Sequence, residues 1–272
     1  MLIVTCIKQV PDTTQVKTDP KTGTLIREGV PSIMNPFDTH ALEESLRLKD
    51  RYGFHVAVIS MGPANTVVTL RKAIAVGADE AVLLSDRAFG GADTLATSTV
   101  LAATVRKLAE KEEVALVICG RQTIDGDTAQ VGPGIATRLG YSQLTLVDQV
   151  IEVDTKARKV KVRRKLEGRH EIVETPLPAL LTVVREINRP RYPNVPMRLA
   201  AEEAPVTIWD NKTMKLPEDI IGLKGSATQV RRIFSPERAK GQIVGDGVNK
   251  PAEAANQLVD ILLEKDILAF TR

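Results

Sequence analysis

The first half of the chain alternates short apolar runs with longer segments of helical periodicity. The apolar runs cover residues 2–8, 55–60, 81–84 and 114–119, and helices are expected over 36–51, 64–76, 94–110 and 128–139. This alternation is typical of βα units, in which helices cover both faces of a parallel sheet. Asn35 followed by Pro36 predicts a helix start, because proline is favoured at the first helical position. The sequence therefore predicts an α/β protein with a Rossmann-like, doubly wound parallel sheet.

From residue 144 the pattern changes to strands without helices between them. Runs at 147–153, 159–166 and 171–174 are separated by polar turns, so we expect added antiparallel hairpins, and the run at 179–184 is expected to return to the sheet. Three prolines between 190 and 196 predict an exposed, semi-rigid loop. A short helix at 197–203, an extended segment at 206–209 and a tail helix at 252–265 follow. We expect an α/β domain over 1–205 and an extended C-terminal arm over 206–272.

Composition argues against two classes of protein. Eight basic residues lie within 156–169, but aromatic residues make up 3% of the chain and none lies among them, so nucleic-acid binding is not expected. No apolar run approaches the roughly 20 residues of a membrane helix.

The chain enters a strand directly at Leu2, so we expect no signal peptide and a cytoplasmic location. Cys6 and Cys119 are expected as free thiols, with a disulfide as the formal alternative.

The segment 117–133 joins a strand to a helix through a polar loop. The strand ends at Cys119 and Gly120, and Asp127 with Thr128 forms a typical N-cap pair. Such a junction presents backbone N–H groups and the positive end of a helix dipole to a ligand, commonly a phosphate. Neither the P-loop motif nor the complete dinucleotide fingerprint is present. The alternative interpretation is an ordinary connection with a capped helix.

Several unusual turns are expected at one edge of the sheet. The carboxyl ends of parallel strands meet there, and ligands bind in the crevice beyond them. Residues 6–8, 60–63 and 119–122 follow three of the predicted strands, and the helix start at 35–36 faces the same edge. We therefore expect them to line one pocket. No nucleophile with a matching base stands out, and the dispersed histidines and two cysteines predict no metal site.

The segment 117–133 resembles the signature of the β subunit of electron-transfer flavoproteins. The resemblance runs from Met1 to about Ile267. Its other matching pieces, in chain order, are Cys6-Ile7-Lys8-Gln9-Val10-Pro11, Met34-Asn35-Pro36-Phe37-Asp38, Ser60-Met61-Gly62-Pro63, Ala75-Val76-Gly77-Ala78-Asp79 and Pro190-Arg191-Tyr192. The resemblance implies one subunit of an αβ heterodimer, in which the α subunit carries FAD.

The resemblance also implies an adenine nucleotide in the β subunit. The positions that match its contacts are Cys6, Asn35, Pro36, Phe37, Asp38, Met61, Gly120, Arg121, Gln122, Asp125, Gly126, Asp127, Thr128, Ala129, Gln130 and Val131. Backbone N–H groups near Ala129 to Val131 would take phosphate oxygens. Asp125 and Asp127 repel phosphate, so we expect them to cap the helix or to accept hydrogen bonds from ribose hydroxyls.

The identity of that nucleotide depends on the branch of the family. In one branch the site holds a structural AMP without its own redox centre; in electron-bifurcating relatives it holds a second FAD that accepts electrons from NADH. The loop 125–133 and the segment 86–98 resemble the bifurcating branch, with Thr94 and Thr97 facing the flavin from one face of a helix start. A flexible loop before a capped helix is the alternative for 86–98. FAD is the favoured prediction, and any oxidation of NADH is expected only in the αβ complex.

The resemblance finally implies a partner that exchanges electrons with the complex, an acyl-CoA dehydrogenase or a quinone reductase. The proline-rich loop matches the family's docking segment, so Pro190, Arg191, Tyr192 and Val195 are predicted partner contacts. Valine stands at 195 where the family pattern has leucine. The alternative is a plain connector between the hairpins and the tail.

Overall fold

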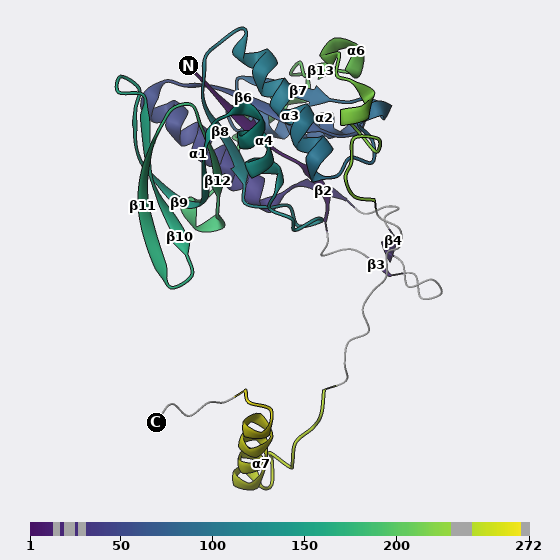
Figure 1. Cartoon of the computed structure of the whole chain (residues 1–272), viewed down its shortest axis with the longest axis vertical. Helices are drawn as coiled ribbons and strands as arrows, with labels where there is room; N and C mark the ends of the chain where they lie inside the picture. The colour runs from purple at the N-terminus through teal and green to yellow at the C-terminus, as the bar shows by residue number, and fades with distance from the viewer. Residues whose placement is uncertain (13–16, 19–24, 27–30, 230–240, 268–272) are drawn as a thin grey trace. The chain divides into compact units, whose positions relative to one another are not determined.

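The computed structural model describes residues 1–12, 17–18, 25–26, 31–229 and 241–267. Its residues form two compact units, Met1–Arg232 and Ile233–Arg272. The first unit holds the predicted α/β architecture, which is confirmed (Figure 1). The predicted extended segment near Trp209 adds a strand to the main sheet of this unit.

The centre of the first unit is a sheet of nine strands among the described residues. Their spatial order is β11 (Arg169–Pro176), β10 (Lys159–Leu166), β9 (Ser142–Asp154), β12 (Ala179–Val183), β8 (Val114–Gly120), β1 (Leu2–Cys6), β6 (His55–Met61), β7 (Glu80–Leu84) and β13 (Thr207–Trp209). The strands from β12 to β13 pair in parallel, and β9, β10 and β11 pair as antiparallel hairpins. β9 also pairs in parallel with β12, so one strand joins the two parts of the sheet.

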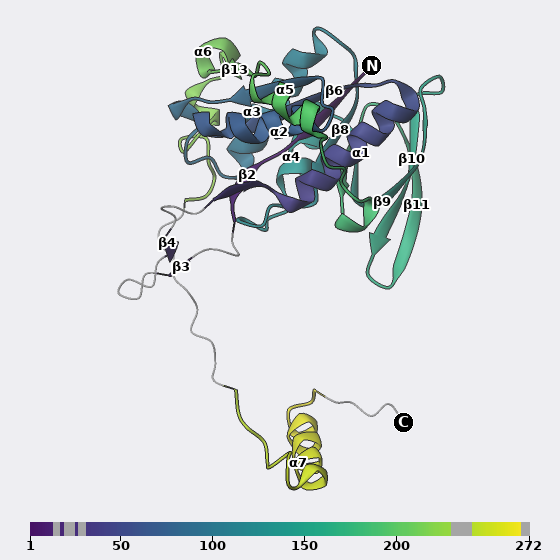
Figure 2. The ribbon, with the colours of Figure 1, turned by 180° about the vertical axis from the view of Figure 1, so that it is seen from behind.

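Helices cover both faces of the sheet (Figures 1 and 2). On one face lie α1 (Pro36–Tyr52) and α2 (Val67–Ala75), with α5 (Val195–Glu202) packed on α2. On the other lie α3 (Thr94–Ala109) and α4 (Val131–Leu139). β1 shows why both faces are needed: its buried side chains alternate, so Ile3 joins the core under α1 and Val4 joins the core under α3.

The remaining elements are short. Two small antiparallel pairs are β2 (Gln9–Pro11) with β5 (Ser32–Met34), and β3 (Lys17–Thr18) with β4 (Leu25–Ile26). Single 3-10 turns are η2 (Ala64–Thr66), η3 (Arg87–Phe89), η4 (Arg185–Ile187) and η5 (Glu218–Ile220), and α6 (Asn211–Met214) follows β13. In the second unit, α7 (Pro251–Glu264) forms the predicted tail helix. Within the described residues, no helix is long and apolar enough to cross a membrane.

The predicted start of α4 is wrong. Asp127 and Thr128 do not cap a helix; α4 begins at Val131, and Gln130 occupies the N-cap position without a capping side chain. Asp127 and Ala129 instead take left-handed backbone angles, with φ of 52° and 55°. The Asp127 carboxylate accepts a hydrogen bond from the Gln122 side chain at 2.7 Å, and its N–H donates to the Thr123 carbonyl at 2.9 Å. These local bonds satisfy Asp127 in a turn and remove it from the helix.

Candidate functional site

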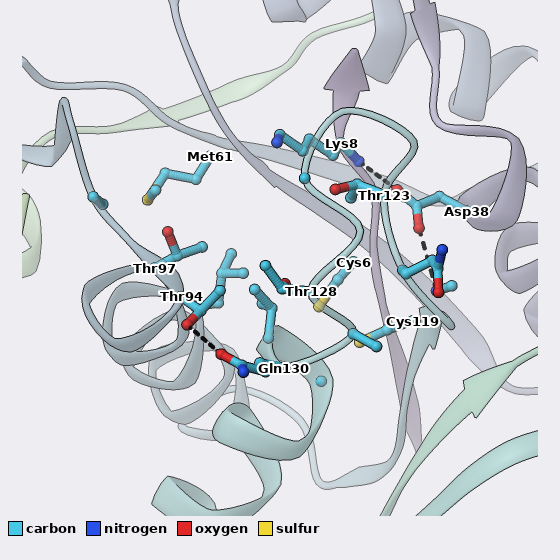
Figure 3. A pocket seen from close by; sticks show the side chains of 18 of the residues that line it. Cys6, Lys8, Asp38, Met61, Thr94, Thr97, Cys119, Thr123, Thr128 and Gln130 are labelled. Carbon is cyan, nitrogen blue, oxygen red and sulfur yellow. Dashed lines mark hydrogen bonds between the residues drawn. The ribbon is translucent and has the colours of Figure 1, made fainter. Parts of the chain in front are cut away.

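A cavity of about 350 Å³ lies at the carboxyl ends of β1, β6 and β8, between them and the starts of α3 and α4 (Figure 3). This volume is within the range of small-molecule sites. Thirteen residues that the sequence singled out as nucleotide contacts line it: Cys6, Asp38, Met61, Thr94, Thr97, Gly120, Arg121, Gln122, Gly126, Thr128, Ala129, Gln130 and Val131. The structure therefore gathers most of the predicted site around one space.

Five of the predicted contacts lie outside that cavity. Asn35 is buried, and its side chain donates to the Gln122 carbonyl at 2.9 Å and accepts from the Ile124 N–H at 3.2 Å. Asn35 thus holds the loop after β8 against the start of α1, where Pro36 is the first helical residue. Phe37 and Asp127 line a neighbouring cavity of about 790 Å³, in which the Arg185 guanidinium lies 4.4 Å from the centre of the Phe37 ring.

The fifth residue, Asp125, closes the loop onto the end of β1. Its carboxylate accepts hydrogen bonds from the Lys8 ammonium at 2.7 and 2.9 Å. Burial raises the pKa of Asp125, but the hydrogen bond and charge of Lys8 outweigh burial and hold it below its usual value. The ion pair joins two segments 117 residues apart, and of its two residues Lys8 lines the cavity.

The starts of α3 and α4 differ in their ability to take an anion. Asp93 caps α3, since its carboxylate accepts from the N–H groups of Leu95 and Ala96 at 2.9 and 3.0 Å. In the described part of the chain no side chain caps α4. The N–H groups at the start of α4 are therefore free for a ligand, and the helix dipole favours negative charge there. Within the cavity, the first turn of α4 is thus better suited to an anion than the capped first turn of α3.

Thr94 and Thr97 occupy the first turn of α3 and project toward the same space as Met61 (Figure 3). The Thr94 hydroxyl donates to the Gln130 side-chain oxygen at 3.0 Å, which links the two helix starts across the cavity. Thr97 leaves its hydroxyl on the cavity wall. Both hydroxyls can hydrogen-bond a polar ring or a ribose placed between α3 and β6.

Asp38 lies at the bottom of the cavity in the first turn of α1. Its carboxylate accepts the Lys8 N–H at 2.8 Å and the Gly120 N–H at 3.2 Å, so it joins the ends of β1 and β8. The residue is 5% exposed. Burial raises the pKa of Asp38 to about 7, against the lowering effects of hydrogen bonds from Asn35, Lys8 and Gly120 and of the Lys8 charge.

Cys6 and Cys119 lie side by side on β1 and β8, and both are buried free thiols, as predicted. The pKa of the Cys119 thiol is raised by its hydrogen bond with Cys6 and by burial. The two residues line the cavity at the ends of β1 and β8. Among the described residues, no group of three or more histidine, cysteine or acidic side chains could hold a metal ion.

The candidate set from the sequence missed part of the lining. The missed residues are Ile7, Lys8, Phe89, Gly91, Ala92, Asp93, Leu101, Cys119, Thr123 and Gly132. Ile7, Lys8 and Cys119 belong to turns that the sequence did place at the sheet edge. Phe89, Gly91, Ala92 and Asp93 belong to the segment 86–98, which the resemblance placed beside the flavin. Leu101 carries no comparable signal, because an apolar side chain on a helix face indicates a core position as well as a cavity wall.

The predicted partner contacts lie on the other side of α1. Arg191 points inward: its guanidinium contacts Glu43 at 2.9 and 3.3 Å and Asp50 at 2.8 Å. Tyr192 and Val195 point outward and are 93% and 71% exposed. Val195 begins α5, which Asn194 caps through the Met197 N–H at 2.8 Å. The loop thus has a fixed base and an apolar, exposed tip.

Comparison with known proteins gives a consistent result. The family model for the electron transfer flavoprotein domain matches residues 22–214. The chain is 52% identical over 266 residues to the electron transfer flavoprotein subunit beta of Clostridium acetobutylicum, covering 97% of this chain and 99% of the relative. It is 51% identical over 271 residues to the caffeyl-CoA reductase-Etf complex subunit CarD of Acetobacterium woodii, with 98% and 100% covered. It is 46% identical over 282 residues to protein FixA of Azorhizobium caulinodans, with 100% and 99% covered.

Proposed function

The chain belongs to the electron transfer flavoprotein family as a β subunit, and from this premise we propose that it binds FAD in the cavity between β1, β6, β8, α3 and α4. Membership makes it an electron-transfer subunit with an α subunit as its partner. We further propose that the bound FAD accepts electrons from NADH in the αβ complex and divides them between two acceptors. The α subunit would carry the second FAD.

The observation that carries the nucleotide assignment is the uncapped start of α4. An FAD or AMP needs a place for its phosphates, and this helix start offers free N–H groups inside a cavity, beside a loop with glycine at 120, 126 and 132. Gly120 and Gly132 pack so closely on neighbouring segments of this chain that a Cβ at either would lie within 3 Å of other atoms. Glycine at these two positions therefore lets the loop and the start of α4 pack against α1 and β12, which holds the free N–H groups at the cavity. The residues present fit a nucleotide phosphate at this helix start.

The choice of FAD over AMP rests on Thr94 and Thr97. An AMP held at α4 would leave Thr94 with its bond to Gln130 alone and would not use Thr97, whereas an extended dinucleotide reaches α3 and the Met61 side of the cavity. When bound, FAD supplies the redox chemistry, and the chain binds and orients it. The alternative, a structural AMP in a subunit without its own redox centre, keeps the same phosphate position.

The cofactor count of the purified αβ complex tests this proposal. Denatured protein would release two flavins per heterodimer if FAD occupies the β subunit. One flavin with one AMP would establish the alternative. One flavin with no second nucleotide would reject a nucleotide site in this cavity.

We also propose that the loop around Tyr192 and Val195 docks the complex to an acyl-CoA dehydrogenase or a quinone reductase. The support is the combination of an exposed apolar tip with the base fixed by Arg191. A preorganised loop loses little entropy on binding. Burying the valine side chain contributes roughly 1.5 kcal/mol or somewhat more.

The second unit supports a role in subunit assembly. Its α7 exposes Leu258, Val259 and Leu263, which lie within six residues on the helix surface. We propose that the C-terminal arm, 206–272, packs its tail helix on the α subunit, since subunit contacts cover apolar helix faces of this kind.

We also propose a cytoplasmic complex, where free thiols such as Cys6 persist.

A further inference from the structure

We propose that nucleotide binding in the cavity is linked to protonation of Asp38, so that the complex takes up a proton when the nucleotide binds near neutral pH. This inference rests on the proposed function, because it requires an anionic nucleotide in this cavity. Asp38 is then a positioning residue with two roles. Its carboxyl group holds the ends of β1 and β8 together, and its protonation state depends on whether the nucleotide is bound.

The first support is the position of the carboxylate. Asp38 lines the cavity and is almost fully buried, between two strand ends that also line it. Its oxygens accept the N–H groups of Lys8 and Gly120, so the charged form is hydrogen-bonded but not neutralised. Gly120 allows this approach, since a Cβ there would lie 2.4 Å from the Asp38 oxygen.

The second support is the charge around it. In the described part of the chain no lysine or arginine forms an ion pair with Asp38, because the nearby Lys8 ammonium is bound by Asp125. The titratable and charged groups that face this end of the cavity from the packed elements are Cys6, Lys8, Asp93, Cys119, Arg121 and Asp125. The first turn of α1 favours the carboxylate and burial favours the acid. The two opposing effects leave both forms accessible near pH 7.

A bound nucleotide shifts this balance in one direction. Its phosphates add negative charge to the same cavity, and a like charge disfavours the carboxylate. By linkage, a ligand that raises the affinity for a proton is itself bound more tightly by the protonated form. Affinity should therefore be constant below about pH 6 and fall as pH rises, by up to about tenfold per pH unit once the free carboxyl is ionised.

Calorimetric titration of the αβ heterodimer, depleted of its nucleotide, tests this linkage. FAD is the informative probe, because its pyrophosphate does not titrate near neutrality, whereas the phosphate of AMP has a second pKa of about 6. At each pH, titrations in two phosphate-free buffers that differ in ionisation enthalpy, acetate and MES at the lower pH and Tris and Tricine at the higher, give the number of protons taken up. We expect almost none at pH 5.5 and up to about one at pH 8.5.

Two variants separate Asp38 from its surroundings. Asp38→Asn should bind FAD with little pH dependence and no proton uptake. Asp154→Asn removes an exposed carboxylate at the turn between β9 and β10, outside the cavity, and should retain the uptake of the parent. If Asp38→Asn does not fold, the infrared band of a protonated carboxyl should still grow when FAD binds to the parent at pH 8.

The outcomes distinguish this inference from the proposed function. No binding of either FAD or AMP would reject the nucleotide site itself. Binding of FAD without proton uptake at pH 8.5, or with equal uptake in Asp38→Asn, would overturn the role of Asp38 and leave the nucleotide site intact.

Discussion

Replacing Gly120 by alanine should separate two parts of the candidate site that the structure holds in contact. Gly120 ends β8 against the first turn of α1. A Cβ at this position would lie 2.4 Å from an Asp38 oxygen and 2.7 Å from both the carbonyl carbon and the Cβ of Phe37. Two of these atoms are backbone or next to it, so no side-chain rotation relieves the clash. The start of α1 must move away from β8.

The expected cost follows from two effects. Overpacking of a tight site costs about 1–3 kcal/mol, and the hydrogen bond from the Gly120 N–H to Asp38 is strained or lost at about 1 kcal/mol more. For a chain of this size, about 2–4 kcal/mol corresponds to a fall in melting temperature of roughly 4–16 °C. Because the same contact forms the bottom of the cavity, nucleotide content should fall as well.

Melting curves and released nucleotide, both measured on the αβ complex, check this expectation. Gly126→Ala is the matched control, because a Cβ there meets one atom, the Thr123 hydroxyl, at 3.4 Å. Its melting temperature should stay within about 3 °C of the parent, since ordinary contacts change stability by 1 kcal/mol or less. If Gly120→Ala melts and retains nucleotide as Gly126→Ala does, the argument from close packing is wrong.

Four further changes probe other parts of the molecule. Replacing Thr94 and Thr97 together by valine should alter the spectrum or redox behaviour of one flavin of the complex; no response from any flavin, with the protein intact, would favour AMP. Val195→Asp should slow electron delivery to the partner dehydrogenase tenfold or more at limiting partner concentration. Ile172→Asp, on the exposed edge strand β11, is the control and should leave the rate unchanged. Equal rates for the two variants would reject the docking loop. Arg191→Ala should weaken partner binding without changing flavin content, because it releases the base of that loop from Glu43 and Asp50. The control is Arg189→Ala, which replaces an exposed arginine two residues earlier. An equal effect of the two substitutions would contradict the anchoring role of Arg191. Burial raises the pKa of Asp38 from 3.8 to about 7, so the folded state binds more protons than the unfolded state between these values. The contribution of Asp38 to stability is therefore complete at low pH and is lost as pH rises to about 7, by roughly 1.4 kcal/mol per pH unit. Denaturant titrations from pH 5 to 8 should show a loss of about 2–3 kcal/mol in the parent and none in Asp38→Asn, and a parallel decline in both would assign it to other groups.

The parallel part of the sheet could be predicted because its strands are buried on both faces. A continuous apolar run such as 2–8 has few other stable placements in an α/β chain, and β1 occupies Leu2–Cys6 of it. The start of α4 could not be predicted in this way. Asp127 has the residue type of a helix cap, but Gln122 competes for its carboxylate, and that competition depends on the path of the loop.

The candidate site was predictable to the extent that it follows from topology. Strand ends that share one edge of a parallel sheet must come together, which places Cys6, Met61 and Gly120 around one space. The side-chain pairs that shape the cavity were not predictable. Asn35 with the loop and Lys8 with Asp125 join positions 87 to 117 residues apart, and no local pattern records such pairs. The pairing of the three-residue strand β13 with β7 was not predictable either, because so short a segment does not identify its neighbour in the sheet. In the structure, Trp209 of this strand is buried.

Helix α1 connects the cavity to the loop that we propose as the docking segment, so a change at the start of α1 can affect both. Its first turn holds Asp38 against the strand ends, and Glu43, little more than one turn later, holds Arg191. A displacement of the helix start, as expected for Gly120→Ala, is therefore transmitted to the base of the loop, and partner binding should weaken together with nucleotide retention. The reverse transmission is absent from the geometry: Val195 is exposed and begins another helix, so Val195→Asp leaves α1 in place and should leave the nucleotide site unchanged. The two substitutions differ because Gly120→Ala acts on α1 itself, whereas Val195→Asp acts on an exposed side chain of another helix.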